Sequence, residues 1–96
     1  MGADGAVPVS ANIIPNLIVN LYKSFRMGKM EEAKKIQYKI IPIIDICELP
    51  SFPAEIKDAL NVLGKKVGQV RKPILPLTEQ NKKKVRQMIN NFFNYL

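Results

Sequence analysis

The stretch from Gly2 to Pro15 constrains the fold of this chain more than any other. Its residues 6–11 are small and largely apolar, which predicts a short strand covered on both faces. Ser10 and Asn12 can accept hydrogen bonds from the free amides of a following helix, and Pro15 suits the first turn of that helix. A single strand cannot pair with itself, so its edges need partners. The pattern of the remaining chain is helical, and the chain therefore resembles the tail of something larger.

Apolar periodicity predicts four helices after this strand or extended segment, joined in a mainly α bundle. Gly28 and Gly64 suit C-terminal caps, Pro42 is expected to bend the second helix without ending it, and Thr78 is a typical N-cap. The first expected helix begins near Pro15, and the second runs from about 30 to 47. The third begins at Pro53 and the fourth after Thr78, with an extended connector over 65–77 between them. Their expected apolar faces are Leu17, Ile18, Leu21, Tyr22 and Phe25; Ala33, Ile36, Ile40, Ile43 or Ile44, and Cys47; Ile56, Ala59, Leu60 and Leu63; and Val85, Met88, Ile89, Phe92 and Leu96.

Length and composition fit one domain with a modest core. The chain has 96 residues, of which 47% are hydrophobic, so it can bury a core and is not expected to be disordered. Its longest apolar run, 40–46, is interrupted by Pro42 and Asp45 and is too short to cross a bilayer. We therefore expect a soluble, cytoplasmic protein without a membrane partner.

The residue types that carry most enzyme chemistry are scarce. Histidine is absent and Cys47 is the single cysteine, so an intrachain disulfide and a zinc site built on histidine or cysteine are excluded by count. Asp45 and Glu48 are three residues apart, but a solvated helix face explains them better than a paired-carboxylate acid and base. No glycine spacing matches a phosphate-binding loop. We expect no catalytic residue, no metal site and no cofactor.

The net charge of +7 leaves a second class of function open. Basic residues gather at Lys65-Lys66, at Arg71-Lys72 and in the stretch 82–86. Such clusters could contact phosphates, which makes a small basic nucleic-acid-binding protein the alternative, together with a scaffolding protein. Against nucleic acid, the lysines of the last helix lie on its wet side, and no aromatic residue alternates with them.

Four segments, in order along nearly the whole chain, resemble the dihydrodipicolinate synthase and N-acetylneuraminate lyase family of class I Schiff-base aldolases. The first, residues 2–12, looks like the eighth barrel strand of the family. Gly28 with Ala33 and Gln37 resembles its helical turn after the eighth barrel helix. The segment 52–60 resembles its proline-led segment with a lysine and an alanine-leucine pair. The segment 71–77, followed by Thr78, resembles its arginine and double-proline connector.

The resemblance implies a fragment of a TIM-barrel protein that makes or breaks carbon–carbon bonds of pyruvate or another 2-keto acid. Residues 1–28 would be the remnant of barrel strand 8 and helix 8, and residues 29–96 the C-terminal helical domain. The family's Schiff-base lysine, acid/base tyrosine and threonine-rich loop all lie upstream, so we expect this chain alone to be inactive. Gly5 and Val7 match positions that line the family's substrate pocket, whereas Pro8 departs from the small polar residue often found there.

Isolation of such a segment predicts self-association. The strand and the first helix would expose apolar surface that a complete barrel covers, so we expect a homo-oligomer formed by helix exchange, with residues 2–11 disordered or differently paired. Two origins stay open: Met1 is an internal methionine of a longer protein, or the chain is a real short product of a split gene.

Overall fold

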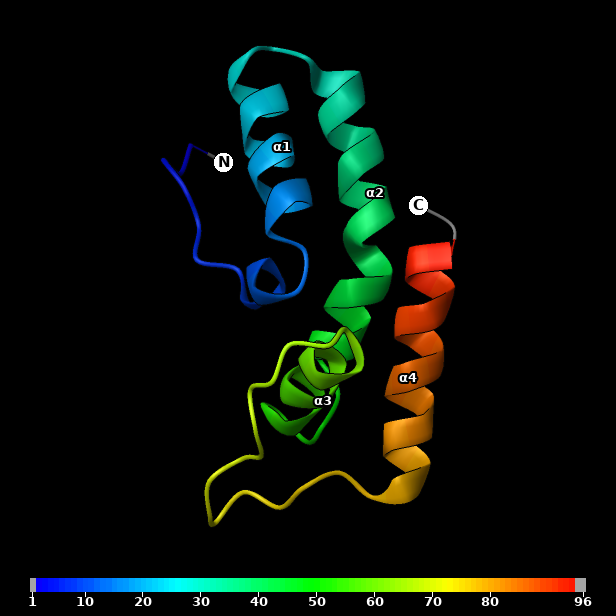
Figure 1. Cartoon of the computed structure of the whole chain (residues 1–96). Coiled ribbons are helices and arrows are strands. Elements are labelled where there is room, and N and C mark those ends of the chain that lie inside the picture. Colours follow the sequence, from blue (N-terminus) through cyan, green and yellow to red (C-terminus); the bar gives the residue numbers. More distant parts are fainter. Residues whose placement is uncertain (1, 95–96) are drawn as a thin grey trace. The chain divides into compact units, whose positions relative to one another are not determined.

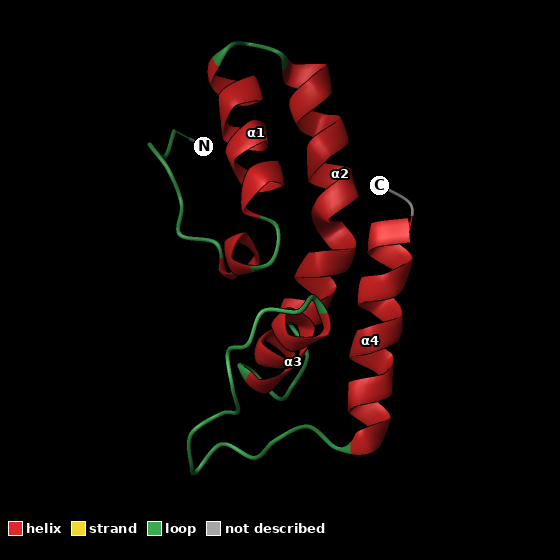
Figure 2. Ribbon diagram, in the orientation of Figure 1, coloured by secondary structure: helices red, strands yellow, loops and turns green. Residues whose placement is uncertain are grey.

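A computed structural model of the protein describes residues 2–94. In chain order they form the 3-10 helix η1 (Val9–Asn12) and the α-helices α1 (Pro15–Arg26), α2 (Met30–Cys47), α3 (Ala54–Val62) and α4 (Glu79–Asn94) (Figure 1). None of the described residues is in a strand (Figure 2). The chain divides between Ile41 and Pro42 into two compact units, which we describe separately.

Of the two expectations for residues 6–11, a strand or an extended segment, the strand is wrong, because none of these residues is in a strand. Val9–Asn12 instead forms η1, in which the Ala11 amide donates to the Pro8 carbonyl at 3.1 Å. Residues 2–7 are exposed and have no regular structure, and Pro8 has an extended backbone. A strand needs a neighbour for its ladder hydrogen bonds, and none of the described residues forms such a neighbour. Local hydrogen bonds form only around η1, while the backbone of residues 2–7 is exposed.

The start of α1 also differs from the expected cap. The N-cap is Ile14, without a side-chain hydrogen bond. The side-chain amide of Asn12 points backward and donates to the Val9 carbonyl at 3.0 Å, while the Ser10 carbonyl accepts from the Ile13 and Ile14 amides. Pro15 begins the helix as expected, because its missing amide is not needed there.

In the first unit, α1 and the first turns of α2 run antiparallel (Figure 1). Gly28 joins them with φ +75°, and the Lys29 amide donates to the Ser24 carbonyl at 2.9 Å, so the predicted glycine cap is confirmed. The expected apolar face of α1 is covered only in part, since Tyr22 and Phe25 are 50% and 54% exposed. The buried side chains of this unit are Ser10, Ile13, Ile14, Ser24, Ala33 and Ile40.

The second unit contains the end of α2, α3 and α4, and α3 packs on α4. Helix α2 continues through Pro42, as predicted. The apolar side chains buried here are Ile43, Ile46, Ala54, Ile56, Ala59, Leu60, Leu77, Val85, Ile89 and Phe92. Ile46 was not predicted, although it lies three residues after Ile43 on the same helix face. Of the expected positions, Cys47, Leu63 and Met88 are half-buried, and Leu96 lies outside the described residues.

Local chemistry sets the ends of α3 and α4. Gly64 ends α3 with φ +82°, and the Asn81 amide donates to the Thr78 hydroxyl oxygen at 3.2 Å at the start of α4, as predicted. The connector between them stays out of helix, as expected, but it is irregular and turns at residues 71–74 instead of being extended throughout. Leu77 near its end is buried. Across the part of the chain that the structure describes, no helix is long and apolar enough to span a membrane.

Candidate functional site

The two residues expected to line a substrate pocket lie on the exposed N-terminal segment. The Val7 side chain is fully exposed, and no atom beyond Gly5 and its two chain neighbours comes within 4 Å of the position that a Cβ on Gly5 would occupy. Asp45 and Glu48 are also exposed, in keeping with a solvated helix face. Among residues 2–94, no group of three or more acidic, cysteine or histidine side chains could hold a metal ion.

Two side chains one turn apart on α3 hold the connector against that helix. The Lys57 ammonium group donates to the backbone carbonyls of Val67 at 3.4 Å and of Gln69 at 3.2 Å. The Asn61 side chain donates to the Gly68 carbonyl and accepts from the Val67 amide, both at 3.2 Å. We call this pair, Lys57 and Asn61, the α3 clamp. Residues four apart share a helix face, so both can reach one stretch of chain.

A shallow pocket, open to solvent, lies beside the clamp and has room for about one water molecule. It is lined by Ala54, Lys57, Asp58, Asn61, Gly68, Gln69, Val70, Pro76, Leu77 and Lys82. Its two cations already have partners, since Lys57 is engaged by carbonyls and Lys82 lies 3.5 Å from a Glu79 carboxylate oxygen. The pocket therefore offers a bound ligand few free charged groups.

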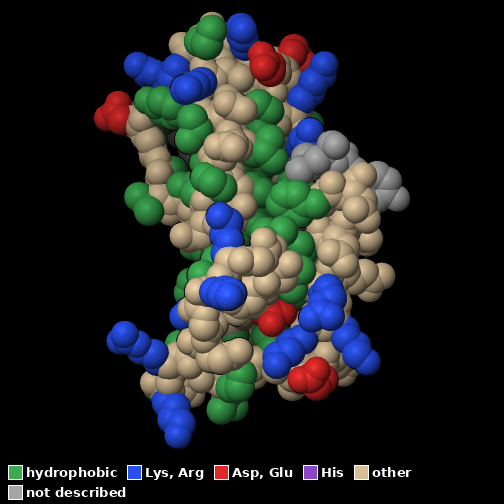
Figure 3. Space-filling model, in the orientation of Figure 1, with side chains coloured by type: hydrophobic (Ala, Val, Ile, Leu, Met, Phe, Trp, Pro, Cys, Tyr) green, Lys and Arg blue, Asp and Glu red, His purple; other side chains and the backbone are tan. Residues whose placement is uncertain are grey.

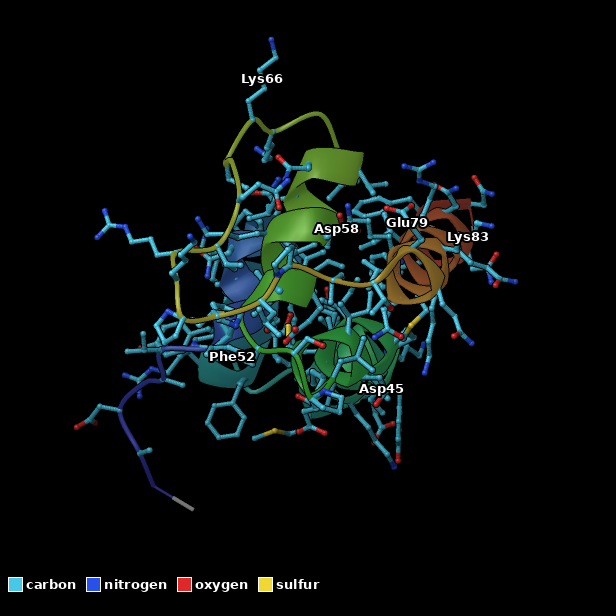
Figure 4. The ribbon with its side chains drawn as sticks, turned by 90° about the horizontal axis from the view of Figure 1, so that it is seen from below. Asp45, Phe52, Asp58, Lys66, Glu79 and Lys83 are labelled. Carbon is cyan, nitrogen blue, oxygen red and sulfur yellow. The ribbon has the colours of Figure 1, made fainter. Side chains whose placement is uncertain are left out.

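The carboxyl group of Asp58 belongs to a mixed cluster of charges between α3 and α4 (Figure 4). Burial raises its pKa above the ordinary value, and the cations of Lys82 and Arg86 oppose that shift, while Glu79 adds to it. Charges of both signs lie close together here, so they largely neutralise one another. This pattern is typical of a structural ion network as well as of a site.

A buried acid lies at the start of α3. The Glu55 side chain is fully buried, and neither of its carboxylate oxygens has a hydrogen-bond partner among the described residues. Burial raises its pKa. Burial also raises the pKa of the nearby Cys47 thiol, and the negative charges of Glu55 and Glu48 raise it further. A thiol with a raised pKa forms little thiolate, so this cysteine is a poor nucleophile.

Sequence reasoning identified neither the α3 clamp nor the buried acid. The four-residue spacing of Lys57 and Asn61 was visible, but a clamp also requires the connector to return over α3. Glu55 lies in the first turn of a helix, where an acidic residue is ordinarily exposed and favoured by the helix dipole. No sequence signal separates that common case from a buried one.

Comparison with known proteins now identifies the family. The sequence model of the dihydrodipicolinate synthetase family matches residues 1–92. The chain belongs to this family. It is 37% identical over 92 residues to a 4-hydroxy-tetrahydrodipicolinate synthase of Brachyspira hyodysenteriae, a match that covers 96% of this chain and 31% of the relative. It is 36% identical over 91 residues to the synthase of the same name from Methanococcus maripaludis strain C7, covering 95% of this chain and 32% of that protein.

Solved structures agree with this assignment. A crystal structure of a dihydrodipicolinate synthase matches with a TM-score of 0.85 and 28% identity, over 99% of this chain and 33% of that one. A monomeric variant of dihydrodipicolinate synthase matches with a TM-score of 0.83 and 26% identity, over 97% of this chain and 30% of that one. The chain thus spans about a third of its relatives. The resemblance drawn from the sequence and the mainly α, four-helix fold of a TIM-barrel fragment are both confirmed.

Proposed function

We propose that the chain is the C-terminal part of a dihydrodipicolinate synthase-like lyase or aldolase that acts on pyruvate or another 2-keto acid. Membership of the family, with coverage of about a third of each relative, supports this proposal. Residues 1–28 would correspond to the last strand and helix of the barrel, and residues 29–96 to the C-terminal helical domain. Gly5 and Val7 would line a substrate pocket only within an intact barrel.

The chain alone is proposed to be inactive, because its lysines lack the surroundings of a Schiff-base nucleophile. Such a lysine needs a lowered pKa, which burial among apolar groups or a neighbouring cation provides. None of the lysines, all of which the structure describes, is buried. Lys57 and Lys82 are half-buried, but the first donates to backbone carbonyls and the second pairs with Glu79.

Borohydride trapping tests this proposal directly. The chain is incubated with pyruvate and sodium borohydride, and its intact mass is measured, with the complete Brachyspira synthase as the positive control. We expect the reduced pyruvate adduct on the control and no adduct on this chain. An adduct on this chain, or turnover of a 2-keto acid by it, would contradict the proposed inactivity.

We further propose that the chain forms homo-oligomers through α1, by helix exchange between copies. The apolar side chains of Val19, Tyr22 and Phe25 on this helix are 48%, 50% and 54% exposed, and a second copy would remove them from water. Sedimentation velocity of the double variant Tyr22→Ser/Phe25→Ser should show a smaller species than the unchanged chain. Tyr38→Ser on α2, where the side chain is 63% exposed, is the matched control. A monomer at every concentration of the unchanged chain would contradict this part.

A further inference from the structure

The connector between α3 and α4 combines positive charge with exposed apolar side chains. Lys65, Lys66, Arg71 and Lys72 are all exposed, and residues 64–77 contain no acidic residue. No ion pair within residues 2–94 involves these four cations. Three apolar side chains of the same stretch are exposed as well, Val67 by 38%, Ile74 by 39% and Leu75 by 79%. Figure 3 shows Lys and Arg side chains projecting beside hydrophobic ones over this connector.

The backbone presents these side chains in a defined arrangement. The Ile74 amide donates to the Arg71 carbonyl at 3.0 Å and closes a turn. We call residues 71–75 the connector tip. Proline rings at 73 and 76 restrict the backbone on both sides of Ile74 and Leu75. The α3 clamp fixes residues 67–69 on the helix, and Lys66 beside them points away from α3 (Figure 4). A surface ordered before binding loses less conformational entropy on binding.

The mixture of side chains indicates the chemistry of the partner. Cations alone would suit any polyanion, including nucleic acid. A single-stranded nucleic acid is bound largely by stacking on aromatic residues, and residues 64–77 contain none. An anionic phospholipid surface offers phosphate groups for the cations and an acyl boundary for aliphatic side chains such as Leu75. It is the partner that uses both kinds of exposed group.

We propose that the connector tip, together with Lys65 and Lys66, docks this protein on an anionic phospholipid surface. The cations lie at the headgroup phosphates, and Ile74 and Leu75 enter the boundary between headgroups and acyl chains. The expectation of no membrane partner rests on the lack of a bilayer-crossing segment. Peripheral docking needs no such segment. The proposed docking does not rest on the function proposed above for the chain.

Sedimentation with vesicles tests the proposal. The full chain is mixed with vesicles of phosphatidylcholine alone, or of phosphatidylcholine with phosphatidylserine, and the bound fraction is measured after centrifugation. We expect binding only to the vesicles that contain phosphatidylserine, and weaker binding as salt is raised. Arg71→Gln/Lys72→Gln should weaken the partition coefficient about 25-fold, which corresponds to about fivefold for each charge near the surface. Leu75→Ser should weaken it about tenfold.

Lys83→Gln/Lys84→Gln on α4 is the matched control, since it removes the same charge from exposed positions outside the connector. It should change the partition coefficient less than about threefold, because distant charges are screened. Circular dichroism of each variant checks that it is folded. An equal loss in this control, or an unchanged Leu75→Ser variant, would overturn the proposal. So would tighter binding of a double-stranded DNA that depends on Arg71 and Lys72 but not on Leu75, since the surface would then belong to nucleic acid.

Discussion

The ammonium group of Lys57 on α3 lies 3.2 Å from the backbone carbonyl oxygen of Gln69, which is 12 residues further along the chain. With the hydrogen bonds of Asn61 one turn later, it joins an irregular connector to a regular helix. Backbone groups that would otherwise bond only to water thereby gain fixed partners. The clamp explains how a connector with few buried side chains keeps a defined path between α3 and α4.

Removal of the amide of the clamp should loosen the connector. Asn61→Ala deletes a donor and an acceptor, and typical net values for two exposed hydrogen bonds predict a loss of about 1–2 kcal/mol in the free energy of unfolding. Urea unfolding measures that loss. The Val67 amide donates to the Asn61 side-chain oxygen in the unchanged protein, so its hydrogen exchange should become faster in the variant. Asn90→Ala on α4, at an exposed position, is the control. It should leave exchange at Val67 unchanged and should not lower the free energy of unfolding, because alanine favours a helix more than asparagine does. Unchanged exchange at Val67 in Asn61→Ala would contradict the clamp.

The buried carboxyl of Glu55 should make stability depend on pH. Its pKa in the folded state is raised above the ordinary 4.5 by burial, so the folded protein holds this proton more tightly than the unfolded chain. The free-energy cost of ionising the buried carboxyl in the folded protein is therefore absent below pH 4.5, and it lowers stability as pH rises through the folded-state pKa. Denaturant unfolding between acid and neutral pH should show this decline, apart from the contributions of other groups.

Two variants isolate the contribution of Glu55. Glu55→Leu removes a buried carboxylate that has no partner, and at neutral pH it should raise the free energy of unfolding by about 1–3 kcal/mol. Glu55→Gln should flatten the pH dependence, because the amide does not titrate. Glu48→Gln, at an exposed position in the same unit, is the control and should leave the slope nearly unchanged. A slope that persists in Glu55→Gln would show that another group causes it.

The glycine between α1 and α2 should not tolerate a side chain. Gly28 has φ +75°, a left-handed conformation that disfavours residues with a Cβ by about 1–2 kcal/mol. The Gly28→Ala variant should therefore lose about that much stability, although no atom beyond the two neighbouring residues lies within 4 Å of the added methyl group. Gly5→Ala provides the comparison, since Gly5 has an equally open environment without a positive φ. Similar thermal midpoints for the two variants would refute a backbone origin of the effect.

Features set by neighbouring residues could be predicted from the sequence, and features set by distant ones could not. Gly28, Gly64 and Thr78 act within one helical turn, and each forms the predicted cap. The strand over residues 6–11 requires a partner strand, and the described chain contains none, so local bonds formed η1 instead. The α3 clamp depends on the return path of the connector, which periodicity does not describe. Burial of Glu55 likewise depends on what packs over the start of α3.

Ile46 offers the sharpest test of the core of the second unit. Its side chain is fully buried, like that of Ile43 one turn earlier, whereas Ile41 on the same helix is 40% exposed. Truncation of a fully buried isoleucine removes apolar contacts and leaves a cavity, so Ile46→Ala should lower the free energy of unfolding by about 2–5 kcal/mol. Ile41→Ala makes the same chemical change at a partly exposed position and should lower it much less, by about 1 kcal/mol or under. Urea unfolding of both variants measures the difference. If the two losses were equal, the register of α2 would differ from the one described, because a rotation of the helix exchanges these two faces.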